Sequence, residues 1–258
     1  MSAGAQVLLC GRSRDWYAFD LHEGRIHRVR GVAGRSEAGF SEIVVSPDGT
    51  MLTLTTESGA LLLVSARTKQ LVHTVQGARS DKWGCQAAAF SPDGATLYSA
   101  RAATVQVWDV RRRCCVHTFR ERGGNRCTAL AASADGALLA AGSDSGAVSV
   151  YATGGGGGGL LGSSDPAPTK EFLNLTTAVT HVGFNGTSEL LSFSSKYLKG
   201  SMRMAHVAGQ RVFPNWPTSK TPLNYVQCAA FSPGSGLFAA GNDKGKVLLY
   251  RLNHYTSA

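Results

Sequence analysis

The sequence has few charged residues and no long apolar run. Only 17% of its 258 residues are charged, and its longest apolar stretches, such as residues 60–64, fall far short of the ~20 residues that a membrane-spanning helix needs. Residues 1–10 are too short and too poor in charge to form a secretory leader. These absences predict a soluble, intracellular chain without a membrane partner.

The cysteines and histidines lack the spacing of metal ligands. None of the six cysteines forms a Cys-x-x-Cys pair, and most fall in or beside predicted strands, so we expect buried free thiols. The seven histidines stand singly, and His73 and His117 recur at the same place in a repeat, ahead of Thr74 and Thr118. Recurrence with the repeat indicates a structural strand residue rather than a ligand.

Motifs for nucleotide chemistry are also absent. The run of glycines at 154–159 matches Gly-x-Gly-x-x-Gly only by repetition and precedes no expected helix. Ahead of Gly245-Lys246, a phosphate loop would require glycine where Ala240 stands. No Ser/His/Asp or Cys/His group stands apart from the repeat positions. We therefore expect no enzyme activity, no catalytic or metal-binding residues and no cofactor.

What the sequence does contain is a turn that returns at a nearly constant period. Ser46-Pro47-Asp48-Gly49 recurs at 91–94, at 133–136 with alanine in place of proline, and in weaker form at 185–188 and 232–236. The steps of about 42 to 52 residues fit propeller blades of about 40–45 residues with loop insertions. Short apolar runs flank each turn, and glycine turns at 57–59, 144–146 and 243–245 separate the second run from the third. The pattern predicts an all-β chain built from four-stranded blades.

Counting the predicted strands leaves the set of blades incomplete. Four complete blades are expected at residues 40–75, 85–119, 127–174 and 178–214, and three strands each near 5–30 and 225–252 form two partial blades. Because an open edge leaves backbone groups unpaired, we expect further strands upstream of residue 1, so that the chain is part of a larger propeller.

Two loops interrupt the period within what we treat as a single domain over 1–258. Residues 152–168 form a Gly-rich insertion between the third and fourth strands of a blade. Residues 214–222 carry Trp216 among prolines. This tryptophan either packs against its own blade or serves as a docking point for a peptide or an RNA base.

The charge is unbalanced. The net charge is +9 and the isoelectric point is about 9.5. Arginines gather at residues 25–35 and again at 111–126. This balance favours an anionic partner, nucleic acid above all, although a solvated basic surface kept for solubility gives the same count.

The residues Trp108-Asp109 at the end of a predicted third strand match the WD-repeat motif, although the Gly-His pair common in such repeats is missing, which predicts blades held mainly by apolar packing. The C-terminal third resembles one family more closely, the U3 small nucleolar RNA-associated protein 18 family. The segments that carry this resemblance are 174–180, Phe184-Asn185, Ser188-Glu189, 231–236, 241–252 and His254-Tyr255. A weaker likeness reaches back to Ser2, Trp16-Tyr17 and Asp20.

The resemblance implies a seven-bladed WD-repeat β-propeller, here an incomplete ring with four full and two partial blades. It further implies a non-catalytic nucleolar scaffold in the UtpB subcomplex of the small-subunit processome, needed for pre-ribosomal RNA processing. Contact with U3 RNA and pre-ribosomal RNA would be direct or through neighbouring proteins. The family's N-terminal extension, which recruits the exosome's helicase, is not part of this sequence. The candidate RNA-proximal residues are Arg111, Arg112, Arg113, Arg122 and Arg126.

Two other classes of function remain open at this point. A generic WD-repeat adaptor, such as a ubiquitin-ligase substrate receptor or a histone-peptide reader, would carry an acidic or arginine-accepting central pocket. A propeller hydrolase would need convergent carboxylates on the first strands, and residues 87–90, 128–131 and 226–231 contain none.

Overall fold

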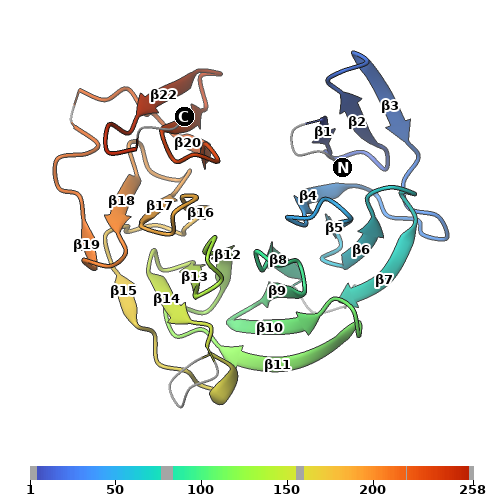
Figure 1. Cartoon of the computed structure of the whole chain (residues 1–258), viewed down its shortest axis with the longest axis horizontal. Helices are drawn as coiled ribbons and strands as arrows, with labels where there is room; N and C mark the ends of the chain where they lie inside the picture. The colour runs from blue at the N-terminus through green and yellow to red at the C-terminus, as the bar shows by residue number, and fades with distance from the viewer. Residues whose placement is uncertain (1–4, 77–83, 155–159, 219, 256–258) are drawn as a thin grey trace. The chain divides into compact units, whose positions relative to one another are not determined.

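The computed structural model describes residues 5–76, 84–154, 160–218 and 220–255. These residues form β-strands and one short 3-10 helix, η1 (Leu160–Gly162) (Figure 1). None of the described segments is a helix long and apolar enough to cross a membrane.

The strands form six sheets, each made from strands consecutive in the chain. Four sheets have four strands and two have three, as the turn spacing predicts. The three-stranded sheets are β1 (Gln6–Leu9), β2 (Trp16–Asp20) and β3 (Arg25–Val29), and β20 (Val226–Phe231), β21 (Leu237–Asn242) and β22 (Val247–Arg251). The four-stranded sheets are β4 (Phe40–Val45), β5 (Met51–Thr56), β6 (Leu61–Ser65) and β7 (Leu71–Gln76); β8 (Cys85–Phe90), β9 (Thr96–Arg101), β10 (Thr104–Asp109) and β11 (Cys114–Arg120); β12 (Cys127–Ala132), β13 (Leu138–Ser143), β14 (Val148–Ala152) and β15 (Lys170–Phe172); and β16 (His181–Phe184), β17 (Leu190–Ser194), β18 (Met202–His206) and β19 (Arg211–Val212).

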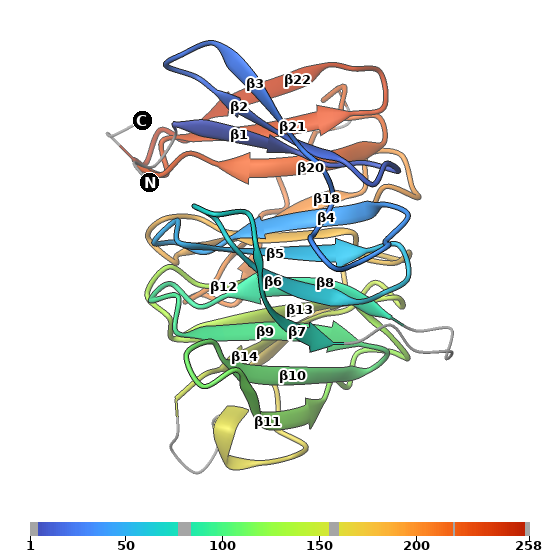
Figure 2. The same cartoon turned by 90° about the vertical axis from the view of Figure 1, so that its right-hand side faces the viewer.

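The chain divides into two compact units. The first comprises residues 1–102 with 107–116, and the second comprises 103–106 with 117–258, so that β10 and β11 contribute residues to both. In the first unit, β4 and β5 run antiparallel and pair Val44 with Thr53 (Figure 2). In the second, the first strands β12, β16 and β20 of three successive sheets lie side by side (Figure 1).

The recurring turn has the same hydrogen bonds in each well-matched copy. In the turn from β8 to β9, Ser91 Oγ donates to the carboxylate of Asp93 and accepts the backbone N–H of Thr96 at 2.9 Å. The copies at Ser46–Asp48 and Ser133–Asp135 repeat this arrangement. In the degenerate copy, Asn185 Oδ1 accepts the N–H of Leu190 instead, at 2.8 Å. The period in the sequence is therefore the period of one local hydrogen-bonded turn.

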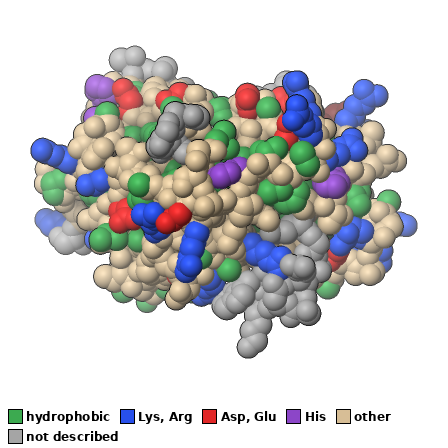
Figure 3. All heavy atoms as spheres, turned by 90° about the horizontal axis from the view of Figure 1, so that it is seen from below, with side chains coloured by type: hydrophobic (Ala, Val, Ile, Leu, Met, Phe, Trp, Pro, Cys, Tyr) green, Lys and Arg blue, Asp and Glu red, His purple; other side chains and the backbone are tan. Residues whose placement is uncertain are grey.

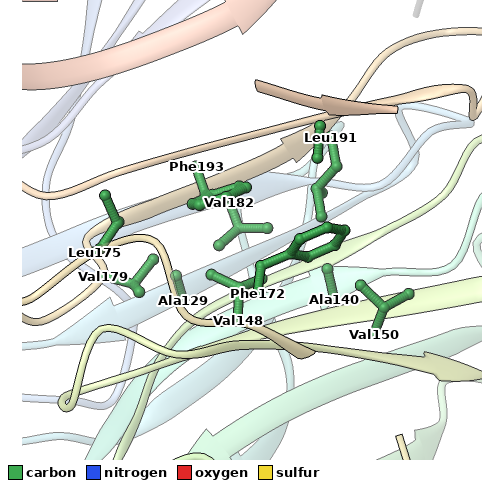
Figure 4. Close-up of a cluster of buried hydrophobic side chains, with 11 residues drawn as sticks. Ala129, Ala140, Val148, Val150, Phe172, Leu175, Val179, Val182, Leu191 and Phe193 are labelled. Atoms are coloured by element: carbon green, nitrogen blue, oxygen red, sulfur yellow. The ribbon is translucent and has the colours of Figure 1, made fainter. Parts of the chain in front are cut away.

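Apolar side chains from neighbouring sheets interlock in the second unit. Val148, Val150 and Phe172 of the sheet β12–β15 meet Leu191 and Phe193 of the next sheet, and the two phenylalanine rings stack at 5.8 Å (Figure 4). These side chains are at most 4% exposed. Burial of this kind contributes about 25 cal/mol per Å² of apolar surface, and it holds the loops of adjacent sheets in a constant relationship.

The prediction that the cysteine thiols are buried is wrong for half of them. Cys85 and Cys127 are buried and Cys10 is partly buried, whereas Cys114, Cys115 and Cys228 are exposed. Cys114 and Cys115 lie on β11, an edge strand of its sheet, and Cys228 lies on a face of β20 that the described residues leave uncovered. None of the six forms a disulfide within the described part of the chain.

Candidate functional site

Arg111, Arg112 and Arg113 form the exposed turn between β10 and β11, in the first unit. Asp109 shapes this turn, because its carboxylate accepts the backbone N–H of Arg112 at 2.8 Å and its carbonyl accepts that of Arg113 at 2.8 Å. The Arg112 side chain also pairs with Asp109, with Nε 3.7 Å from Oδ2. Arg113 adopts φ of 56°, so the turn is tight and directs all three side chains to solvent.

Two carboxylates lie near this turn. Arg111 and Arg113 line a hollow of about 270 Å³ together with Asp48 and Asp93 of the recurring turns. The hydrogen bond from Ser91 is the main cause that lowers the pKa of Asp93, and the charge of Arg111 contributes. A hydrogen bond from Ser46 likewise lowers the pKa of Asp48, so both aspartates are charged at neutral pH and offset part of the basic charge.

Arg122 and Arg126 lie in the second unit and are held by carboxylates. Arg122 forms a bidentate pair with Asp165, with 2.7 Å from Nε to Oδ1 and 2.6 Å from Nη2 to Oδ2. Arg126 Nε lies 3.2 Å from Oδ2 of Asp144. The first pair ties the segment after η1 to the loop between β11 and β12. The five predicted arginines therefore lie in two different units, and the two in the second unit, Arg122 and Arg126, each have an aspartate partner.

Beside Arg122, the carboxylate of Glu121 is fully buried. Its Oε1 accepts the N–H of Gly123 at 2.7 Å and the hydroxyl of Ser149 at 2.9 Å, while Oε2 has no hydrogen-bond partner among the described residues. Burial raises the pKa of Glu121 and raises that of the neighbouring Tyr151 to about 12. With Glu121 at 0% exposure, a substrate has no access to this acid, which instead anchors the loop.

No metal centre is formed by the described part of the chain, which contains no group of three or more His, Cys, Asp or Glu side chains close enough to share an ion. On the face seen in Figure 3, basic side chains are interspersed with apolar and neutral ones. On this face the basic side chains do not gather into one patch.

An exposed basic and apolar turn that the sequence reasoning missed joins β17 to β18. Lys196, Tyr197, Leu198 and Lys199 are all exposed, with Tyr197 at 61% and Leu198 at 46%. The sequence could have indicated this turn, because two apolar residues stand between two lysines at a position where the repeat predicts a turn.

The loop after β19 packs against the last sheet. Trp216 is half-buried and makes edge-on ring contacts with Phe238 at 5.8 Å and Tyr250 at 5.5 Å. Trp216 therefore packs inside the fold, but on the following sheet and not on its own blade as one interpretation predicted. Beside it lies a groove of about 580 Å³, which His206, Phe213 and Tyr255 also line.

Residues that carry the family resemblance meet at this groove. The Tyr255 hydroxyl donates to Glu189 Oε2 at 2.7 Å and accepts from Asn185 Nδ2 at 3.1 Å. Tyr255 is also the main cause that lowers the pKa of Glu189. The segments around Asn185, Glu189 and Tyr255 are separate in the sequence, and the fold joins them into one hydrogen-bonded network.

Comparison with known proteins agrees with this architecture. The WD domain, G-beta repeat, matches residues 69–109 and 113–151. The chain is 36% identical over 256 residues to a U3 small nucleolar RNA-associated protein 18 homolog of Arabidopsis thaliana, covering 99% of this chain and 45% of that protein. The Mus musculus homolog is also 36% identical over 256 residues, covering 98% of this chain and 45% of its own length. A probable U3 small nucleolar RNA-associated protein 18 of Schizosaccharomyces pombe is 30% identical over 257 residues, covering 98% and 47%.

A solved structure shows the same fold. A chain in the crystal structure of the mitotic checkpoint complex superposes with a TM-score of 0.73 at 18% identity, covering 96% of this chain and 72% of that one. The fold is a WD-repeat β-propeller. The chain spans about half the length of the curated relatives it matches.

Proposed function

We propose that this chain, which belongs to the U3 small nucleolar RNA-associated protein 18 family, acts as a non-catalytic scaffold in pre-ribosomal RNA processing within the small-subunit processome. The observation that carries the proposal is the 36% identity, across 99% of the chain, to a protein named for its association with U3 small nucleolar RNA. The proposed partners are proteins of the UtpB subcomplex, U3 RNA and pre-ribosomal RNA, and the proposed location is the nucleolus.

The architecture suits a scaffold for a physical reason. The recurring turns have backbone groups satisfied by buried side chains such as Ser91 and Ser133, and neighbouring sheets of the second unit interlock through Phe172 and Phe193. Loops mounted on such sheets keep their positions, so several partners can bind at once without an ordering cost for each loop.

Location and RNA association test the proposal directly. A tagged copy of the chain expressed in cells should concentrate in the nucleolus, and its purification under native conditions should enrich U3 RNA over spliceosomal RNAs. A generic WD-repeat adaptor would instead distribute through the nucleoplasm or cytoplasm without U3 enrichment, and that result would overturn the proposal.

The arginines between β10 and β11 remain our proposal for an RNA-proximal surface in the first unit. Arg111 and Arg113 are the stronger candidates, since Arg112 pairs with Asp109 in its own turn. Arg122 and Arg126 contribute less free charge because each already faces an aspartate.

Charge reversal tests this surface. The double variant Arg111→Glu and Arg113→Glu should weaken co-sedimentation with pre-ribosomal particles at moderate salt, because phosphate contacts are replaced by repulsion. Arg25→Glu with Arg30→Glu makes the same change of net charge elsewhere in the first unit and serves as the control. Equal sedimentation of both variants and the unmodified chain would remove these arginines from the proposed surface.

A further inference from the structure

The loops at one end of the second unit form a continuous surface. Within three sheets, a backbone hydrogen bond joins two of these loops: the Asp144 N–H to the Arg126 carbonyl at 2.9 Å, Thr180 to Ser194 at 2.8 Å and Asp243 to Tyr225 at 3.0 Å. Two further bonds join neighbouring sheets: the Val179 N–H to the Ser143 carbonyl at 2.9 Å and the Gly200 N–H to the Asn224 carbonyl at 2.8 Å. Each link joins the entry to one strand with the turn of a neighbouring strand. Side chains on these loops therefore keep constant relative positions.

The turn from β17 to β18 stands out on this surface because its backbone is anchored while its side chains are free. Ser195 is fully buried, and its N–H donates to the Ser201 carbonyl at 2.9 Å. The Lys196 N–H donates to the Thr180 hydroxyl at 3.1 Å. The four side chains from Lys196 to Lys199 nonetheless lie in solvent, so the fold does not use them for packing.

These side chains combine an exposed ring with unpaired positive charge. The Lys196 ammonium lies 5.6 Å from the centre of the Tyr197 ring. Neither Lys196 nor Lys199 forms an ion pair with any carboxylate in the described ranges. At 61% exposure, the Tyr197 ring remains accessible to a ligand.

A second exposed ring lies next to the first turn. Tyr225 is 42% exposed and follows Asn224, whose carbonyl accepts the N–H of Gly200 at the end of the Lys196–Lys199 turn. Asp243, the acidic residue at this point, is occupied by the Tyr225 N–H at 3.2 Å and by the ammonium of Lys244 at 3.9 Å. Lys246 is exposed beyond it. Lys196 and Lys199 thus lie in the turn that carries Tyr197, and Lys244 and Lys246 lie in the turn whose Asp243 binds the Tyr225 backbone.

We infer that this tyrosine–lysine surface, comprising residues 196–199, Tyr225, Lys244 and Lys246, binds single-stranded RNA. Unpaired bases stack on exposed aromatic rings, and lysines follow the phosphates, which is the recurring chemistry of single-strand binding sites. An acidic peptide would use the lysines but would leave the tyrosine rings without a planar partner. The inference rests on the proposed function and names the RNA structure that this part of the chain would contact.

The experiment measures binding of the full chain to a fluorescein-labelled 12-nucleotide oligouridine by fluorescence anisotropy at several salt concentrations. The double variant Lys196→Ala and Lys199→Ala should bind several-fold more weakly, and its plot of log affinity against log salt should be shallower by about 1.4, because single strands lose about 0.7 per phosphate contact. Tyr197→Ala should weaken binding about tenfold with the salt slope unchanged, because it removes stacking and not charge. Tyr197→Phe keeps the ring and should bind as the unmodified chain does.

Arg211→Ala is the matched control for charge. Arg211 is an exposed basic residue of the same unit. It lies on β19 opposite His206, at the end of β18 that is farther from the Lys196–Lys199 turn. Circular dichroism and thermal melts establish that each variant is folded. The single variant Lys199→Ala is measured beside Arg211→Ala. The inference is overturned if the Lys196/Lys199 and Tyr197→Ala variants bind as tightly as the unmodified chain, or if Arg211→Ala weakens binding as much as Lys199→Ala does.

Two further outcomes separate the inference from the proposed function. Loss with the lysine variant but not with Tyr197→Ala, together with equal competition by polyglutamate, would show a site for any polyanion and overturn the RNA assignment. U3 RNA that still co-purifies with variants defective in oligouridine binding would leave the scaffold function standing without this surface. Oligouridine binding that depends on Tyr197 in a chain that enriches no U3 RNA would overturn the proposed function and leave the surface.

Discussion

The indole Nε1 of Trp108 on β10 donates a hydrogen bond to Ser99 Oγ on β9, at 3.1 Å. Ser99 is fully buried, and Trp108 packs against the cluster that contains Leu61, Leu63 and Leu97. The sequence lacks the Gly-His pair of strong WD repeats, which predicts blades held mainly by apolar packing. At this sheet the serine and tryptophan add a polar link between strands to that packing.

Removing the donor should be costly because it leaves a buried hydroxyl without this partner. Trp108→Phe should lower the free energy of unfolding by about 2–3 kcal/mol, from the unmet hydroxyl and the smaller ring. Urea unfolding followed by circular dichroism measures this change.

The double variant with Ser99→Ala isolates the hydrogen bond. If the bond matters, the two substitutions together cost less than the sum of the single effects, by about 1 kcal/mol. Additive effects would mean that Trp108 contributes through packing alone.

The recurring turn makes a second prediction. Ser133→Ala should cost about 1–2 kcal/mol, because the buried Ser133 Oγ accepts the Leu138 N–H at 2.9 Å and donates to Asp135. Ser164→Ala, at an exposed serine of the same unit, should change little. Equal unfolding midpoints for the two variants would contradict a stabilising role for the turn.

The same turn makes stability sensitive to acid. The hydrogen bond from Ser133 is the first cause that lowers the pKa of Asp135 in the folded chain. A lowered folded-state pKa adds stability above the ordinary aspartate value, and that stability is lost as the pH falls through it. The Ser133→Ala variant should therefore lose less stability between pH 5 and pH 3, in the range of the ordinary aspartate pKa, than the unmodified chain does. A steeper loss in the variant would contradict this origin.

Tyr255→Phe should release the C-terminal segment. The hydroxyl bonded to Glu189 and Asn185 is lost, which should speed amide hydrogen exchange at residues 252–255 and raise the pKa of Glu189 toward its ordinary value. Mass spectrometry and carboxyl NMR titration measure the two effects. Tyr17→Phe, at an exposed tyrosine of the first unit, is the control and should alter neither quantity.

His181 makes the second unit sensitive to mild acid. Burial lowers the pKa of His181 to about 4 from 6.5, and its Nε2 has no hydrogen-bond partner among the described residues. The unfolded chain therefore binds a proton that the folded chain excludes, so stability should fall as the pH drops from about 6.5 to about 4, by up to about 3 kcal/mol.

Leucine at this position tests the effect. His181→Leu should flatten the stability profile in that window, whereas His22→Leu, at an exposed histidine, should leave the slope intact. Denaturation midpoints measured at half-unit steps of pH give the profile. A slope unchanged in His181→Leu would assign the acid sensitivity to other groups.

The strands and turns of this chain depend on interactions between residues close in the sequence, so they could be predicted without a structure. Ser91, Asp93 and Thr96 lie within five residues of one another, so their hydrogen bonds depend on nothing distant, and the period of that turn sets the order of the sheets. Gly59 and Gly146 indicate the turns between the second and third strands of their sheets, because each adopts a positive φ that glycine tolerates best.

The surface was decided by contacts between residues far apart in the chain. Arg122 binds Asp165, 43 residues away in the sequence, and Tyr255 binds Glu189, 66 residues away. A local sequence pattern therefore does not indicate which charges are neutralised or that Tyr255 is anchored. Cys114 and Tyr197 have apolar neighbours in the sequence but lie in solvent. Local hydrogen bonds determine that a segment is a strand or a turn, whereas burial depends on which other segments cover it, and only the packed sheets settle that.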